Sequence, residues 1–126
     1  MFVFEKSIKY GNTVLEKSFN FSIRIVKLFE YLINKNRNIE PLLKQLLRSG
    51  TSIGANITEA QSAYTKKDFI NKLGIPLKEA RESEYWIKLL PATNHLDKKE
   101  SVSIQNDCEE SIKLLITIIK SSKRNM

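Results

Sequence analysis

Apolar residues recur every three or four positions through most of this chain, and this spacing restricts it to helical folds. Between Leu15 and Ile33 they form two neighbouring stripes, and similar stripes continue through the later segments. Alternation at every second residue, which marks strands, is almost absent, and the chain has only four glycines and three prolines. We therefore expect an all-α protein whose first helix, with its double apolar face, is buried on two sides.

The turn-forming and capping residues between these stripes set the expected boundaries. They divide one domain, residues 1–126, into four helices that follow an N-terminal extension at residues 1–13. The helices are expected at about residues 15–34, 41–63, 66–90 and 102–122.

Local signals refine the last two helices. Thr65 is expected to cap the third helix at the backbone N–H of Asp68. Ser101 or Ser103 is the expected cap of the fourth. Gly74 and Pro76 lie inside the third helix, and a proline there removes a backbone hydrogen bond, so we expect a kink near residues 72–76.

The stretch RSGTSIGANITE contains Gly50 and Gly54 and allows two interpretations, a phosphate-binding loop or a helix. A phosphate-binding loop needs a preceding strand and a Lys-Ser or Lys-Thr pair after the last glycine, and this stretch has neither. A helix instead places both glycines on one face, where a neighbouring backbone can approach closely. Since each glycine costs about 1 kcal/mol relative to alanine inside a helix, we expect that face to contact another helix.

A polar stripe runs beside the glycine face. It could be a solvated face or a hydrogen-bonded network buried between helices, and the weak helix propensity of Ser and Asn favours the network. In the third helix, Glu82 is expected to pair with a basic residue of another helix, and Trp86 to anchor packing. The residues of the polar stripe are Arg48, Ser52, Asn56 and Glu59.

The sequence offers no set of residues for catalysis. Glu79 and Glu82 share a helix face, but a di-metal bundle also needs Glu-x-x-His, and the only histidine, His95, lies in a connection. No nucleophile has a partner base, and no nucleotide motif is present. We therefore expect no enzyme activity, no cofactor and no metal.

Cysteine use and hydropathy point to the cytoplasm. The single cysteine, Cys108, cannot form an intrachain disulfide, which fits a reducing compartment, and it is expected to be a small core residue. In the opening segment MFVFEKSIKYG, the apolar run before Glu5 and Lys6 is too short for an export signal or a membrane span. No membrane partner is expected.

A formal net charge of +7 makes a polyanion a reasonable partner. A basic surface that serves only solubility is the alternative, and cations at the end of a helix also favour its dipole. The expected nucleic-acid contacts lie outside the apolar stripes, at the start of the third helix and the end of the fourth: Lys66, Lys67, Lys72, Lys120, Lys123 and Arg124.

Two sequence blocks resemble a known family. The blocks LLRSGTSIGANITE (46–59) and DFINKLGIPLKEARESEYW (68–86), with the leading LEKSF (15–19), are similar to the four-helix-bundle proteins encoded in intervening sequences of bacterial 23S ribosomal RNA genes. The chain departs from that pattern at Gly74 and Pro76, where a continuous helix is expected, and at Ala60, where glycine is usual.

The resemblance implies an antiparallel up-down four-helix bundle that assembles into a ring-shaped homopentamer. Relatives include the accessory protein of diversity-generating retroelements, so RNA, DNA, a reverse transcriptase and a ribosomal RNA component are candidate partners. We expect a non-enzymatic oligomer that binds nucleic acid through phosphates, with a protein-interaction scaffold as the alternative. The matching positions are read as framework and interface residues: Ser52, Ile53, Asn56, Ile57, Glu59, Glu82 and Trp86.

Overall fold

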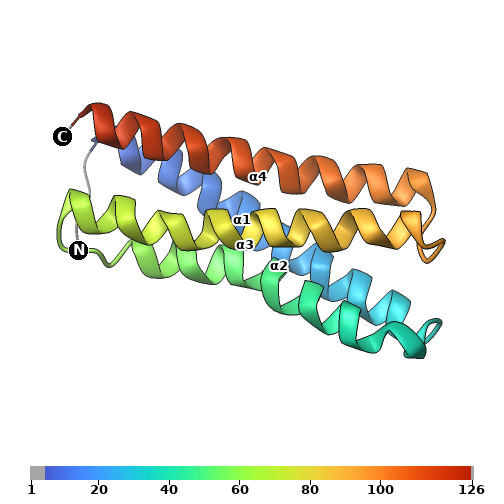
Figure 1. The fold of residues 1–126 in the computed structure, drawn as a ribbon. Coiled ribbons are helices and arrows are strands. Elements are labelled where there is room, and N and C mark those ends of the chain that lie inside the picture. The colour runs from blue at the N-terminus through green and yellow to red at the C-terminus, as the bar shows by residue number, and fades with distance from the viewer. Residues whose placement is uncertain (1–4, 126) are drawn as a thin grey trace.

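The computed structural model describes residues 5–125, with side chains from residue 13 onward. Four long helices lie side by side and alternate in direction along the chain (Figure 1). The expected all-α, four-helix architecture is therefore confirmed, and the described residues contain no strand. The elements are α1 (Glu5–Ile33), the short 3-10 helix η1 (Arg37–Ile39), α2 (Glu40–Ala60), α3 (Lys66–Ala92) and α4 (Lys98–Arg124).

The helix ends differ from the sequence boundaries mainly at the starts of α1 and α4 and at the end of α2, which stops at Ala60, three residues before the expected end. Helix α1 begins at Glu5, so most of the expected N-terminal extension is helical. Helix α4 begins at Lys98, because Asp97 caps it by accepting a hydrogen bond of 2.8 Å from the backbone N–H of Glu100. The expected Ser101 or Ser103 cap is therefore wrong, and Ser101 is buried within the helix.

Helix α3 begins at the expected cap but lacks the kink that its local residues predict. The hydroxyl of Thr65 accepts a hydrogen bond of 3.0 Å from the backbone N–H of Asp68, which confirms the expected cap. The helix then runs without interruption through Gly74 and Pro76, and Figure 1 shows no sharp bend near them. A proline removes only one backbone bond, and the buried ring of Pro76 packs toward the core, so helix packing overrides the expected kink.

The core fills the space between the four helices, and each helix contributes one apolar face to it. On the inner of the two apolar stripes of α1, Phe21, Ile25 and Leu32 are fully buried. On the outer stripe Phe19 stays 66% exposed and Val26 42% exposed. Burial of α1 on two sides is therefore not achieved within the single chain, and an apolar face is left at the surface.

The helices pack unevenly. Helix α2 packs extensively against α1 and α3, and α4 packs extensively against α3 but less so against α1. In the part of the chain with described side chains, two ion pairs join the looser α1–α4 seam, Arg24 with Asp107 and Lys17 with Glu110. Within the described residues, no helix has both the length and the apolar character to cross a membrane.

Candidate nucleic-acid interface

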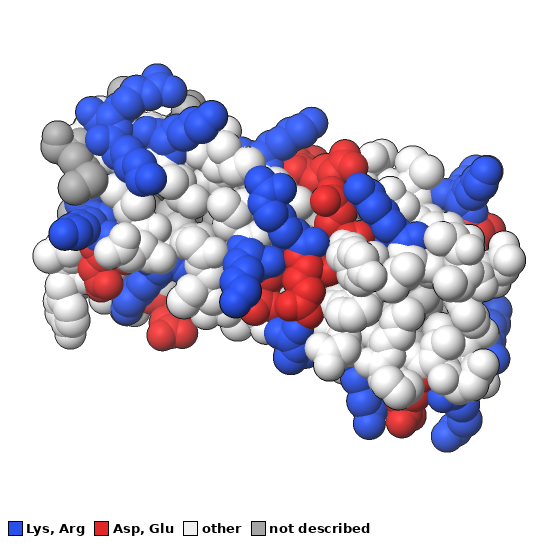
Figure 2. Space-filling model, viewed as in Figure 1, with Lys and Arg blue, Asp and Glu red and all other residues white. Residues whose placement is uncertain are grey.

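The antiparallel packing of α3 and α4 brings the start of one helix beside the end of the other (Figure 1). Figure 2 shows Lys and Arg side chains gathered at that end of the bundle, where α4 finishes. We call this cluster the basic end. It unites five of the six cationic residues expected to contact nucleic acid: Lys66, Lys67, Lys120, Lys123 and Arg124.

Four of the five side chains of the basic end are exposed to a ligand. Lys67, Lys120, Lys123 and Arg124 are exposed, and Lys66 is half-buried. Among the described residues, none of the four exposed cations forms an ion pair. Lys123 and Arg124 also occupy the last turn of α4, where positive charge stabilises the helix dipole. The same cations therefore stabilise the end of α4 and form a surface suited to binding an anion.

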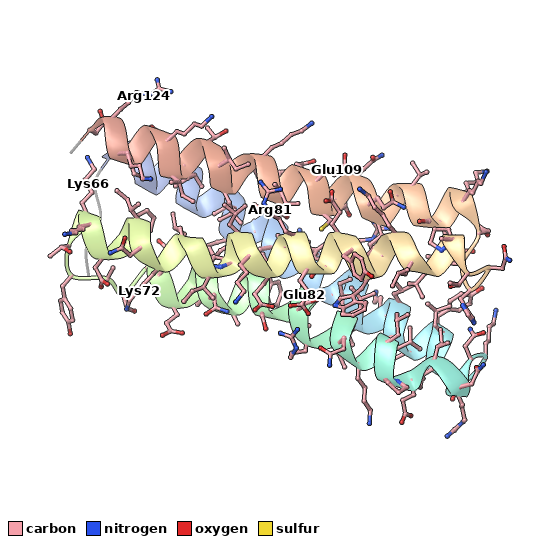
Figure 3. The ribbon with its side chains drawn as sticks, in the orientation of Figure 1. Lys66, Lys72, Arg81, Glu82, Glu109 and Arg124 are labelled. Atoms are coloured by element: carbon pink, nitrogen blue, oxygen red, sulfur yellow. The ribbon has the colours of Figure 1, made fainter. Side chains whose placement is uncertain are left out.

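Lys72 lies apart from the basic end. Figure 3 places it on the side of α3 nearest α2, away from Lys66 and Arg124. Its Nζ is 3.7 Å from Oδ2 of Asp68, one helical turn earlier. The structure therefore separates this residue from the other five expected contacts.

The two glycines of α2 lie where α1 crosses it. A Cβ added to Gly50 would be 2.8 Å from Cγ1 of Ile25, and one added to Gly54 would be 3.2 Å from the carbonyl oxygen of Ser18. Distances this short require a neighbour to move. The expectation of a close helix crossing at these glycines is confirmed.

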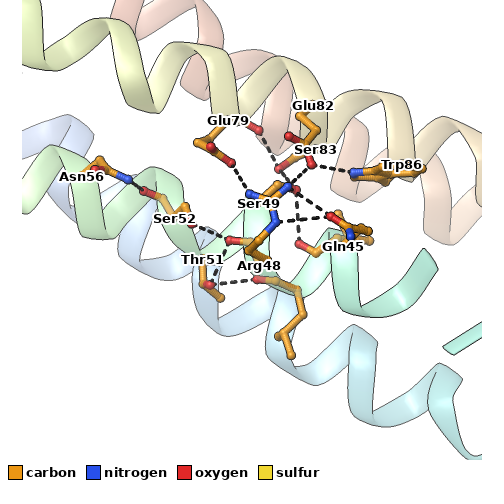
Figure 4. Close-up of polar contacts among 12 residues, drawn as sticks. Gln45, Arg48, Ser49, Thr51, Ser52, Asn56, Glu79, Glu82, Ser83 and Trp86 are labelled. Atoms are coloured by element: carbon orange, nitrogen blue, oxygen red, sulfur yellow. Dashed lines mark hydrogen bonds and ion pairs between the residues drawn. The ribbon is translucent and has the colours of Figure 1, made fainter. Parts of the chain in front are cut away.

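One residue of the polar stripe, Arg48, joins two helices (Figure 4). Its guanidinium forms ion pairs with Glu79, at 3.1 Å, and with Glu82, and the same Glu82 carboxylate accepts a 3.0 Å hydrogen bond from Nε1 of Trp86. The Trp86 ring also packs against the core. These contacts confirm the expected interhelical partner of Glu82 and the packing role of Trp86.

The other three residues of the polar stripe do not join helices. Ser52 donates to the carbonyl of Arg48 at 2.6 Å, and Asn56 donates to the carbonyl of Ser52 at 2.8 Å, both within α2. Glu59 is exposed, and its carboxylate forms no hydrogen bond or ion pair within the described residues. The expected buried network is therefore wrong beyond Arg48, because short polar side chains at half-buried helix positions bond the carbonyl four residues earlier.

A buried polar contact between α2 and α3 was not predicted from the sequence. Ser83 Oγ lies 2.9 Å from Ser49 Oγ and 2.9 Å from the carbonyl of Glu79. Both serines are fully buried. Ser49 lies three residues after Leu46 and four before Ile53, so its place on the core face could have been found from the spacing.

The single cysteine is part of the core. Cys108 is fully buried, and its Sγ donates to the carbonyl of Ala80 at 3.3 Å. Burial raises the pKa of this thiol to about 12. The thiol therefore stays protonated at neutral pH and lacks the thiolate that nucleophilic chemistry needs.

Comparisons with known proteins agree with this architecture. The model of a family described as 23S rRNA-intervening sequence protein matches residues 11–117. A crystal structure of a protein with unknown function from the S23 ribosomal protein family of Bacteroides thetaiotaomicron VPI-5482 shares 51% sequence identity with the chain. That match covers 88% of this chain and 98% of the other, with a TM-score of 0.84. No curated protein matches.

Proposed function

Since this chain belongs to the 23S rRNA-intervening sequence protein family, we propose that it is a non-enzymatic oligomer that binds nucleic acid through phosphate contacts. The observation that carries the proposal is the basic end, where two helices contribute cations to one exposed surface. Ammonium and guanidinium groups bind phosphate oxygens without reading base sequence. The ligand we favour is structured RNA or an RNA–protein complex. The unpaired, buried cysteine fits the reducing cytoplasm as the site of action.

The assembly we propose is a homopentameric ring. Its support within the subunit is the outer stripe of α1, where Phe19 and Val26 are exposed. Beside Phe19 lies an apolar hollow of about 490 Å³ between α1 and α2, whose walls include Gly54 and Ala55. An exposed apolar face next to a hollow formed by small residues is typical of a surface that another subunit covers.

Assembly would make a diffuse charge effective. Five subunits with a net charge of +7 would carry 5 × 7 = +35, and symmetry would repeat the basic end around the ring. Because phosphate binding releases counterions, the affinity should fall by several orders of magnitude between about 50 and 200 mM salt if six to ten phosphates are contacted. Little preference between sequences is expected.

The test is a fluorescence-anisotropy titration of the assembled protein with RNA and DNA duplexes at those two salt concentrations. The variant Lys120→Glu/Lys123→Glu/Arg124→Glu should bind much more weakly than the wild type. A matched control, Lys27→Glu/Lys44→Glu/Lys98→Glu, makes the same change of charge at exposed residues outside the basic end. Equal affinities for the two variants would remove the basic end from the interface.

The second candidate function is a protein-interaction scaffold without a nucleic-acid role. The exposed Phe19 and Val26 favour it, because apolar side chains at a surface serve protein contacts. Failure of the wild-type protein to bind either duplex at about 50 mM salt, where phosphate contacts are strong, would select this function.

A further inference from the structure

Helix α3 carries a continuous ridge of exposed residues on its solvent side. The residues follow one another at steps of four and three, so they form a single line along the helix. Four are cationic and none is acidic. We call this line the α3 ridge: Lys67, Asn71, Gly74, Lys78, Arg81, Tyr85 and Lys88.

Two acidic residues of α3, Glu79 and Glu82, are held away from the ridge, whereas Glu84 Oε1 lies 3.9 Å from Nζ of Lys88, a ridge residue. Arg48 of α2 forms ion pairs with Glu79 and Glu82, and Figure 3 shows Glu82 on the side of α3 opposite Arg81. Within the described part of the chain, Lys78 and Arg81 have no ion-pair partner. The middle of the ridge, at Lys78 and Arg81, therefore presents uncompensated positive charge.

Gly74 occupies the middle of the ridge for no reason visible inside the subunit. It is exposed, and a Cβ added there would meet no atom within 4 Å. Gly50 and Gly54, by contrast, are required by close contacts with α1. A glycine inside a helix is unfavourable relative to alanine, so Gly74 is best explained by something outside the subunit that approaches the helix backbone.

The length and composition of the α3 ridge indicate which ligand approaches it. From Lys67 to Lys88 a helix rises about 32 Å at 1.5 Å per residue, close to one turn of a double helix, about 34 Å. A single strand would need several aromatic platforms for its bases, and the ridge offers only Tyr85. A rigid duplex fits a long, straight row of cations better.

We infer that the α3 ridge is a docking surface for the phosphate backbone of a nucleic-acid duplex, with Gly74 at the point of closest approach. The inference rests on the proposed function and deepens it. It adds Lys78, Arg81 and Lys88 to the nucleic-acid contacts proposed at the basic end, and it specifies a double-stranded ligand. Lys67 belongs to both surfaces and would connect them.

The experiment compares Lys78→Glu/Arg81→Glu with a control of equal charge change, Lys27→Glu/Lys44→Glu, on α1 and α2. Each is titrated with an RNA duplex of about 20 base pairs, roughly two helical turns, and with one of its single strands. The ridge variant should bind the duplex about tenfold or more weakly than the control. Its plot of log affinity against log salt should be shallower by about two units, one for each lost phosphate contact.

Gly74→Ala supplies a second, independent readout. The added Cβ meets open space, so the melting temperature should rise, whereas duplex affinity should fall because the ligand can no longer approach as closely. A variant that gains stability and loses affinity cannot owe its weaker binding to misfolding. Unchanged affinity would refute the close approach at Gly74.

Three other results would overturn the inference. The first is equal duplex affinity of the ridge variant and its control while the wild type binds, which would leave the proposed function intact. The second is a smaller mass of the ridge variant in light scattering, which would make the ridge a subunit contact. The third is equal binding of polyglutamate and duplex, which would indicate an acidic protein as partner. A wild type that binds no nucleic acid would instead refute the proposed function itself.

Discussion

Replacement of glycine by alanine should have opposite effects on stability at Gly74 and at Gly50. Replacing glycine by alanine inside a helix should stabilise it by about 0.5–1 kcal/mol through backbone entropy alone. At Gly74 nothing opposes this gain, because the new Cβ would meet no atom within 4 Å. At Gly50 the new Cβ would lie 2.8 Å from Cγ1 of Ile25, a residue that is 1% exposed and has little room to move.

Overpacking at such a contact costs about 1–3 kcal/mol, which outweighs the entropic gain. Gly74→Ala should therefore unfold at a higher urea concentration than the wild type, and Gly50→Ala at a lower one, in circular dichroism titrations at 222 nm. Protein concentration must be equal in all samples, because the proposed assembly would contribute to the apparent stability. Gly50→Ala as stable as Gly74→Ala would refute the reasoning that close packing, rather than helix propensity, determines the glycines of α2.

Three further predictions follow from other contacts. Cys108 should react with a thiol reagent at about pH 8 only after unfolding, because burial raises its pKa from 9.0 to about 12. The free energy of unfolding should fall as pH rises from about 9 to about 12, because the thiol ionises in the unfolded chain before it ionises in the folded one. Cys108→Ala should reduce that fall. Arg48→Ala should cost no more than about 1 kcal/mol, because its ion pairs are partly exposed, but it should change Trp86 fluorescence by freeing Glu82. Light scattering at micromolar concentration should give about five times the subunit mass of 14.6 kDa, and a monodisperse monomer would contradict the proposed ring.

Local rules predicted the helices well. The Thr65 cap and the helical path through Gly50 and Gly54 depend on neighbours in sequence, so the residues alone were enough to predict them. The path through Pro76 depends on packing that a local rule does not contain, and the expected kink was therefore wrong.

The polar and basic sites depended more on the fold. Periodicity placed Ser52 on a polar stripe, but it could not decide whether its hydroxyl would reach another helix or its own backbone. The cations of the basic end were found in sequence because they lie outside the apolar stripes, although only the antiparallel pairing of α3 and α4 brings them together. Lys78 and Arg81 enter only as proposed contacts, because the sequence does not show that Arg48 pairs with the nearby Glu79 and Glu82.

The weaker packing between α1 and α4 makes local opening of the bundle uneven. The ion pairs of that seam, such as Lys17 with Glu110, have side chains that are 46% and 48% exposed, so salt screens them and they contribute little. Amide hydrogens of the facing turns of α1 and α4 should therefore exchange with deuterium through a partial opening that needs less free energy than global unfolding. This exchange should accelerate with salt, whereas the interior turns of α2, packed between α1 and α3, should exchange only when the whole bundle unfolds.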